Sequence, residues 1–335
     1  MKKRFDVFGM CNALFDIQAE VSDDTLTGLS LDKGGMMLIS HEEQRAIVPK
    51  IYDKLVHTEA GGSGANTVIG VALLGGTACY TSRIGQDEHG RMYREGLAAQ
   101  GIQPNLGAGD GDTGISLILV TPDAQRTMCT YLGMAQDLQA ADVNVADIEA
   151  SRYLYVTGYL WDTENQKQAV LRAMDAAKNA GDVKIAFSLS DPFCVGRHKG
   201  DFRRLLGEYV DVVFANEQEA ISLTDAADAD SAARALSALC RNGNGLAAVT
   251  KDRDGSLLFE GKEMHHIPVY PVTAVDTTGA GDMYAAGLLY GLTQDMSLPV
   301  AGRIASYSAA QVVAKLGPRL PSIDPEAIAV ITREF

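Results

Sequence analysis

Hydrophobic and polar positions follow two different patterns along the chain, and the change falls about halfway. In the first half, residues 12–21 and 36–39 alternate apolar and polar side chains with a period of two, which is typical of half-exposed strands. Residues 115–121 and 126–132 flank the turn-forming residues 122–125 and so predict a β-hairpin. Together these segments predict a small sheet that stands apart from the main core.

In the second half, continuous apolar runs alternate with longer segments of helical periodicity. Runs at 153–157, 183–188, 210–215 and 247–250 have the length of strands and are apolar on both faces, as parallel strands covered by helices are. The pattern predicts an α/β fold, a doubly wound, mostly parallel sheet flanked by helices, with a small β-sheet lid. Helices are expected at residues 165–179, 202–206, 230–242, 281–291 and 298–315.

We expect one large domain with a small appendage rather than two equal domains. The large α/β domain is expected to comprise residues 1–12, 41–111 and 134–335. The lid is expected to comprise residues 13–40 and 112–133.

Composition and charge narrow the class of partner. The 335 residues are 46% hydrophobic and carry a formal net charge of −14, which fits a folded enzyme and disfavours nucleic-acid or anionic-membrane partners. The five cysteines are scattered without a Cys-x-x-Cys pair, so neither a disulfide framework nor a structural zinc site is expected. The chain shows neither a segment of signal-peptide form nor a run of roughly 20 apolar residues, so the expected location is the cytoplasm.

The sharpest motif is Asp-Thr-Thr-Gly-Ala-Gly-Asp at residues 276–282, which opens an apolar helix. Small residues at a helix start leave N–H groups unpaired at the positive end of the helix dipole, so Gly279, Ala280 and Gly281 are expected to form an anion hole for a phosphate. Asp282 at its rim can accept a proton from an incoming hydroxyl. The alternative role of such an aspartate is a helix cap, and the length of the motif argues against it.

A second glycine-rich segment, Gly-Gly-Ser-Gly-Ala-Asn at residues 61–66, leads into another helical pattern. Its glycines permit a ligand to approach the backbone, and the Asn66 amide can bind hydroxyls. Equally, the segment can be only a helix start capped by Ser63. Asn12 and Asp16 lie on one face of a predicted strand, where they can bind sugar hydroxyls or remain solvated edge residues.

A third motif, Asn-Glu-Gln-Glu at residues 216–219, follows an apolar strand, at whose carboxyl end α/β proteins bind ligands. Asn216 and Glu219 are one helical turn apart and can hold a hydrated Mg²⁺ ion. Taken alone, the motif is better explained as a solvated first turn of a helix. No Gly-x-x-x-x-Gly-Lys-Ser/Thr sequence occurs, so a P-loop fold is not expected.

The motifs at 61–66 and 276–282, in this order and separation, resemble the two signatures of the ribokinase-like (PfkB) kinase family, and residues 85–90 resemble its Ile-Gly-x-Asp-x-x-Gly turn. The resemblance covers essentially the whole chain. It implies an ATP-dependent kinase in which Asp282 is the catalytic base beside the anion hole. Within that family, the segments most similar to adenosine kinases are residues 8–16, 61–63, 126–132, 188–193 and 216–219.

The resemblance also implies roles for individual residues. Asn12 and Asp16 would hold ribose hydroxyls, and Arg126 on the lid hairpin would close over the transferring phosphate. Residues 159–161 (Tyr-Leu-Trp) stand where similar kinases have paired aromatic side chains. The other substrate-binding residues implied are Leu14, Leu38, Gly61, Gly62, Ser63, Asn66, Met128, Leu132, Leu160, Phe193 and Thr278.

ATP is expected near the last long helix, with Glu219 as the residue that binds Mg²⁺. The resemblance also allows a monovalent cation such as K⁺ beside the anion hole. The nucleotide-binding residues implied are Asn216, Thr250, Lys251, Gly255, Thr277, Tyr307 and Ser308.

Together these expectations describe an enzyme that phosphorylates the 5′-hydroxyl of a nucleoside and converts adenosine to AMP. The alternatives are a sugar or sugar-acid kinase of the same family, of the ribokinase or 2-keto-3-deoxygluconate kinase type, and a non-catalytic relative that only senses its ligand. The partner is a small-molecule nucleoside or sugar, and the sequence leaves open a monomer or a homodimer.

Overall fold

The computed structural model of the chain describes residues 3–123 and 125–333. In these ranges a sheet of nine strands runs through the molecule in the order β14-β13-β12-β11-β10-β9-β1-β5-β6, parallel from β12 to β6 and antiparallel at β13 and β14. This order confirms the doubly wound, mostly parallel sheet. The strands are β1 (Phe5–Met10), β5 (Ala78–Gly85), β6 (Gln103–Gly109), β9 (Ser151–Thr157), β10 (Lys184–Ser188), β11 (Val212–Asn216), β12 (Leu246–Thr250), β13 (Ser256–Glu260) and β14 (Glu263–Ile267).

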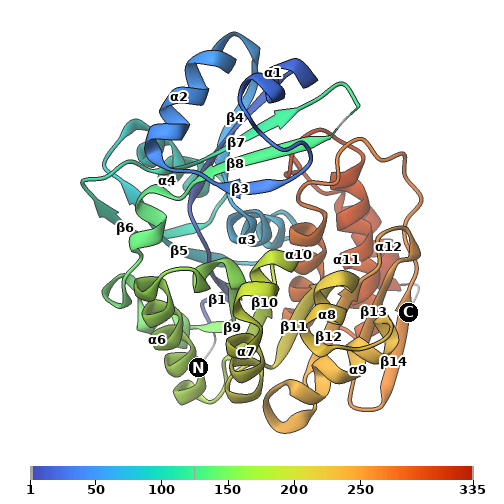
Figure 1. Cartoon of the computed structure of the whole chain (residues 1–335). Coiled ribbons are helices and arrows are strands. Elements are labelled where there is room, and N and C mark those ends of the chain that lie inside the picture. The colour runs from blue at the N-terminus through green and yellow to red at the C-terminus, as the bar shows by residue number, and fades with distance from the viewer. Residues whose placement is uncertain (1–2, 124, 334–335) are drawn as a thin grey trace.

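Helices cover both faces of this sheet (Figure 1) and bury two apolar clusters against it. One cluster joins the sheet to α3 (Ser63–Leu73), α4 (Glu88–Ala99), α10 (Ala280–Thr293) and α11 (Leu298–Val313). The other joins it to α5 (Val145–Glu149), α6 (Glu164–Ala180), α7 (Pro192–Glu208), α8 (Glu217–Thr224) and α9 (Ala229–Leu239). Helix α12 (Pro325–Arg333) packs on α11.

Short 3₁₀ turns complete the elements. They are η1 (Tyr52–Lys54), η2 (Gly133–Asp137), η3 (Ala140–Asp142), η4 (Gly158–Trp161), η5 (Arg241–Gly243) and η6 (Asp252–Asp254).

A second sheet, which has five strands in the described part of the chain, stands apart from the first, at the top of the view in Figure 1. Its order is β3 (Met36–Leu38), β8 (Arg126–Tyr131), β7 (Gly114–Val120), β2 (Leu14–Glu20) and β4 (Leu55–Gly61). Helices α1 (Asp23–Gly28) and α2 (His41–Ile51) cover one face and bury Phe15, Leu117 and Cys129. The antiparallel pairing of β7 with β8 confirms the predicted hairpin.

The expected lid boundary at residue 41 differs from the structure. Strand β4 belongs to the small sheet, where Asp16 of β2 lies opposite Glu59, and α2 packs on the same sheet. Sequence patterning misses β4 because its first residues are largely exposed and lack a regular apolar alternation. Strand β2 is in turn more buried than a half-exposed strand, since α1 and α2 cover one face and the other faces a cleft.

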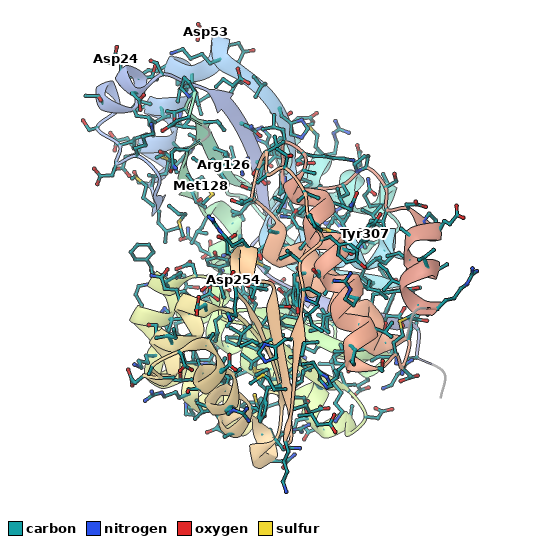
Figure 2. The ribbon with its side chains drawn as sticks, turned by 90° about the vertical axis from the view of Figure 1, so that its right-hand side faces the viewer. Asp24, Asp53, Arg126, Met128, Asp254 and Tyr307 are labelled. Atoms are coloured by element: carbon teal, nitrogen blue, oxygen red, sulfur yellow. The ribbon has the colours of Figure 1, made fainter. Side chains whose placement is uncertain are left out.

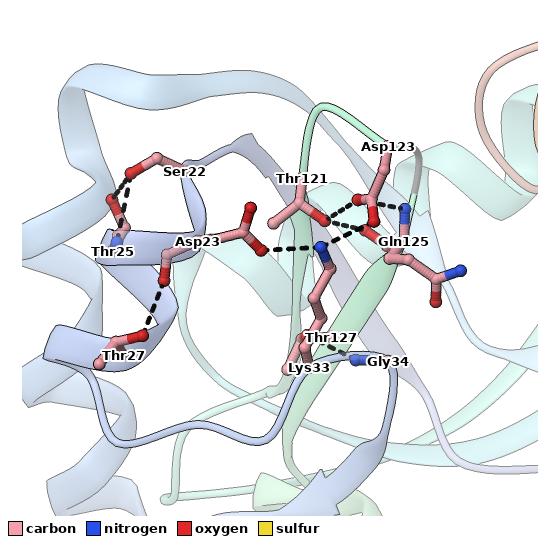
Figure 3. A network of polar contacts seen from close by, with 10 residues as sticks. All are labelled: Ser22, Asp23, Thr25, Thr27, Lys33, Gly34, Thr121, Asp123, Gln125 and Thr127. Carbon is pink, nitrogen blue, oxygen red and sulfur yellow. Dashed lines mark hydrogen bonds and ion pairs between the residues drawn. The ribbon is translucent and has the colours of Figure 1, made fainter.

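A polar network holds the tip of the small sheet (Figure 3). Lys33 donates to Asp23 of α1 over 2.7 Å and to Asp123 of the β7–β8 turn over 2.8 Å. Thr121 donates to the same Asp123 carboxylate over 2.7 Å. The lysine therefore ties α1 to the hairpin that carries Arg126, while residue 124 of the expected turn lies outside the described residues.

All five cysteines lie in the described ranges as buried free thiols. Within the same ranges, no helix combines the length and the apolar character needed to span a membrane.

Candidate active site

A cleft of about 790 Å³ lies between the small sheet and the carboxyl ends of β1, β9, β10, β11 and β12. Figure 2 shows Arg126 and Met128 where the small sheet meets the large domain, far from Asp24 and Asp53 at its outer end. Most residues expected at the site line this cleft. They are Asn12, Leu14, Asp16, Leu38, Gly62, Ser63, Asn66, Arg126, Met128, Leu132, Asn216, Glu219, Thr250, Thr277, Thr278, Gly279, Gly281 and Asp282.

Asp282 lies in the first turn of α10, directly after the glycine-rich loop. Gly279 caps the helix with φ +76°, and a Cβ there would overlap the carbonyl of Pro318, so only glycine fits without strain. The Asp282 carboxylate accepts a hydrogen bond from Ser63 over 2.6 Å and one from Asn66 over 2.9 Å. The two glycine-rich motifs of the sequence therefore meet at one carboxylate.

Two opposing effects act on the pKa of Asp282. Burial raises it, because a charged carboxylate loses hydration. The hydrogen bonds from Ser63 and Asn66, and the charge of Arg319, lower it. A carboxylate held in this balance can accept a proton from an alcohol that enters the cleft.

Asp16 faces the same cleft from β2 and is only 8% exposed. Burial raises its pKa to about 7, and the nearby carboxylates of Glu59 and Asp282 act in the same direction. Gly61, expected to bind substrate, lies behind Asp16 rather than on the cleft wall, since a Cβ on it would overlap the Asp16 carboxylate. Its lack of a side chain makes room for Asp16.

Asn12 lies beside Asp16 in the cleft wall and is nearly fully buried. Its side-chain oxygen accepts a hydrogen bond from Gln166 over 2.7 Å, which fixes the orientation of the amide. Gly62, with φ +94°, lies so close to the Asn12 carbonyl that a Cβ would overlap it. Asp16, Asn12 and Gly62 thus present polar groups to one region of the cleft.

Arg126 points into the cleft from the start of β8 and forms an ion pair with the buried Asp276. Asp276 also accepts hydrogen bonds from the backbone N–H of Thr278 over 2.8 Å and of Gly317 over 2.7 Å. The hairpin arginine therefore lies within reach of the expected anion hole, where an incoming phosphate could replace Asp276 as its partner.

Asn216 and Glu219 form a reciprocal cap at the start of α8. The Glu219 carboxylate accepts from the Asn216 side chain over 2.6 Å and from the Asn216 backbone N–H over 3.0 Å. Burial, with a smaller contribution from Asp191, raises the pKa of Glu219 to about 7. A buried acid at a cleft wall that has no cationic partner among the residues described fits a hydrated divalent ion, which would supply the missing positive charge. Among the described residues, no group of three His, Cys, Asp or Glu side chains is placed to hold a metal by itself.

A second cavity of about 320 Å³ adjoins the loop at 277–281. Thr250, Gly255, Thr277 and Ala280 line it. From α11 it receives Ser306, Ala309 and Ala310, instead of the expected Tyr307 and Ser308. Tyr307 turns away and packs edge-on against the ring of Tyr270, with centroids 5.3 Å apart, and Ser308 is fully buried. Lys251 lines neither cavity.

Two residues expected near the base are placed elsewhere. Leu160 is fully buried in the core, and Phe193 is 68% exposed at the start of α7, outside the cleft wall. Tyr159 lines the cleft instead, because the turn η4 directs it there and its hydroxyl donates to the Ser190 carbonyl over 3.2 Å.

Sequence reasoning also misses two hydroxyls on the cleft-facing side of the small sheet. Ser116 and Thr130 lie on neighbouring strands, and their side-chain oxygens are 3.4 Å apart. Their positions within the predicted hairpin, in register with the apolar residues of one face, could have identified them.

Comparison with known proteins shows which family shares this sequence and fold. The model of the pfkB family carbohydrate kinases matches residues 31–325. A fructokinase from Klebsiella pneumoniae is 30% identical over 237 residues, which are 69% of this chain and 76% of that protein. The structure of adenosine kinase from Sinorhizobium meliloti is 35% identical, with a TM-score of 0.89 over 98% of this chain and 99% of that one. A probable sugar kinase protein from Rhizobium etli CFN 42 is 35% identical, with a TM-score of 0.90 over 98% of both chains. The chain therefore belongs to the pfkB family of carbohydrate kinases and is a transferase that phosphorylates an alcohol.

Proposed function

We propose that the chain phosphorylates the 5′-hydroxyl of a nucleoside and converts adenosine to AMP. The observation that carries the proposal is that Asp282, at the glycine start of α10, shares one cleft with the polar group of Asp16, Asn12 and Gly62. A ribose held by that group would direct its primary hydroxyl at Asp282.

The reaction would use this chain's groups in three ways. Asp282 accepts the proton of the 5′-hydroxyl as the oxygen attacks the γ-phosphorus of ATP, and the bond from that phosphorus to the bridging oxygen of the β-phosphate breaks to release ADP. The backbone N–H groups at residues 279–281 stabilise the charge on the transferring phosphoryl group. Arg126 exchanges Asp276 for that group when the lid hairpin moves over it.

Kinases of this family use ATP with Mg²⁺, and the described residues offer a candidate site for each. The second cavity, with its apolar wall from α11, suits the flat adenine of ATP and opens beside Thr277, which lines both cavities. Asn216 and Glu219 would hold a hydrated Mg²⁺ ion, which would neutralise negative charge on the nucleotide phosphates.

A nucleobase is supported by the wall of the cleft under the small sheet. Leu14, Leu38, Met128 and Leu132 present apolar surface there, and Tyr159 adds a ring. A bare sugar has no flat apolar face of that size to bury. The 35% sequence identity to the adenosine kinase from Sinorhizobium meliloti also supports a nucleoside as the substrate.

A sugar kinase is the second candidate, favoured by the Ser116 and Thr130 hydroxyls in the same wall and by the similarity to a fructokinase. The test is ADP release by the purified protein with ATP, Mg²⁺ and, in parallel, adenosine, inosine, ribose, fructose and 2-keto-3-deoxygluconate. We expect adenosine to have the highest kcat/KM, by about tenfold or more. A sugar or keto-acid that reacts faster would overturn the nucleoside assignment, and no substrate-dependent ADP release would favour a ligand sensor.

A further inference from the structure

Arg319 lies in the loop after α11, outside every motif of the sequence, and its side chain is 13% exposed. Its Nε donates a hydrogen bond to the side-chain oxygen of Asn66 over 2.8 Å. Because the guanidinium is only a donor, it fixes which end of the amide faces it. The amide nitrogen of Asn66 is therefore the end that faces Asp282, to which it donates over 2.9 Å.

The charge of Arg319 acts on two carboxylates of the cleft, those of Asp16 and Asp282. Its Nη1 lies 4.0 Å from the carboxylate of Glu59, which stands opposite Asp16 in the β2–β4 pairing. Its Nη2 is buried and has no partner among the described residues, so Glu59 does not saturate the guanidinium. The positive charge acts on both Asp16 and Asp282 and lowers the pKa of each.

The other titratable groups described near Asp16 and Asp282 do not supply this positive charge. Arg126, the cation of the small sheet in the same cleft, is bound to Asp276. The Cys11 thiol and the Tyr155 hydroxyl lie near Asp282, and burial raises the pKa of both, so they remain neutral near pH 7. Glu59 opposes Arg319 in its effect on the pKa of Asp16.

We propose that Arg319 is a positioning residue of the phosphoryl transfer, which holds the Asn66 amide in the orientation that donates to Asp282 and supplies the positive charge beside Asp16 and Asp282. The proposal rests on the proposed function. A purely structural arginine would tether the C-terminal loop, and its loss would lower stability without changing how activity depends on pH.

The test compares the pH profile of kcat/KM for the wild-type protein with Arg319→Gln, Arg319→Lys and Glu59→Gln. Without the positive charge the carboxylates bind protons more tightly, so the acid limb of Arg319→Gln should move to higher pH by about one unit. Activity should then fall about tenfold at a pH below the limb and much less at alkaline pH. Arg319→Lys should keep most of the wild-type limb, and Glu59→Gln should move it to lower pH.

Arg83→Gln is the matched control, because Arg83 is a similarly buried arginine that pairs with Asp142 over 2.8 Å outside the cleft. It should lower the midpoint of thermal unfolding and leave the acid limb in place. An unchanged limb in Arg319→Gln, or an equal shift in Arg83→Gln, would overturn the proposal. Asp282→Asn distinguishes failure of the proposed function from failure of the Arg319 proposal. If Asp282→Asn keeps wild-type turnover, the proposed function is wrong. If Asp282→Asn is inactive and the acid limb of Arg319→Gln does not move, only the role of Arg319 is wrong.

Discussion

Ser63 donates its hydroxyl hydrogen to the carboxylate of Asp282 over 2.6 Å, across 219 positions of sequence. One residue starts α3 and the other lies in the first turn of α10, and the two helices pack against each other beside the large sheet. The hydrogen bond holds one carboxylate oxygen and leaves the group facing the cleft.

Asp282→Asn keeps the size of the side chain and removes the proposed proton acceptor. We expect kcat to fall by roughly 10²–10⁴-fold, with the KM for ATP changed by only a few-fold. Steady-state ADP release measures both constants. The control is Asp24→Asn at the exposed end of the small domain, and a kcat within a few-fold of wild type in Asp282→Asn would contradict the assignment.

Gly279→Ala should destabilise the loop of the proposed anion hole. An alanine at φ +76° is strained, and its Cβ would overlap the Pro318 carbonyl. We expect a loss of about 1–3 kcal/mol in the free energy of unfolding, measured in urea. Gly281→Ala is matched to it, because a Cβ on Gly281 meets no atom within 4 Å. Equal losses in the two variants would show that backbone conformation is not the cause.

Asp16→Asn should change the dependence of stability on pH. The pKa of Asp16 is raised to about 7 in the folded state, above its unfolded value, so the folded protein binds the extra proton between about pH 4 and 7 and loses stability as pH rises through that window. An asparagine at this position does not titrate, so it causes no such loss of stability as pH rises. We expect the variant to be more stable than wild type at pH 8, by on the order of 2–4 kcal/mol, and equal to it near pH 4.

Chemical unfolding at both pH values measures this difference, and nucleoside phosphorylation should be lost in the same variant. A stability difference that is the same at pH 4 and pH 8 would rule out the titration of Asp16 as its source.

Tyr159→Leu should weaken binding of a nucleoside more than binding of a bare sugar. The ring of Tyr159 lines the cleft and would contact the base. We expect the KM for adenosine to rise about tenfold, consistent with the loss of about 1.4 kcal/mol of aromatic contact. The adjacent Leu160→Ala serves for comparison, because its fully buried side chain should cost about 2–5 kcal/mol of stability without discriminating between substrates. Equal effects of Tyr159→Leu on adenosine and ribose would argue against a base at this wall.

The fold was accessible from the sequence because its signals are local. The apolar runs that became β9 to β12 need burial on both faces, which a parallel sheet between helix layers provides. The glycine-rich loop before α10 likewise indicates a helix start whose N–H groups face outward. These signals depend on a few neighbouring residues and not on distant packing.

The parts of the site that sequence reasoning missed depend on side-chain direction. Whether Tyr159 or Leu160 faces the cleft is decided by the 3₁₀ turn at η4, which no period of two or 3.6 describes. The face of α11 toward the second cavity holds Ser306 and Ala309 instead of Tyr307, and a rotation of about one residue is beyond what helical periodicity alone can fix. Arg319 belongs to no motif, and only the tertiary contact with Asn66 reveals it.

The loop at residues 317–319 has a consequence for how the protein is made. The backbone N–H of Gly317 binds Asp276, the carbonyl of Pro318 closes over Gly279, and Arg319 reaches Asn66. A ribosome must therefore translate this loop before the glycine start of α10 and the first turn of α3 acquire all their partners. Nascent chains that stop short of it lack these contacts, so the cleft is complete only after residues 317–319 have been made.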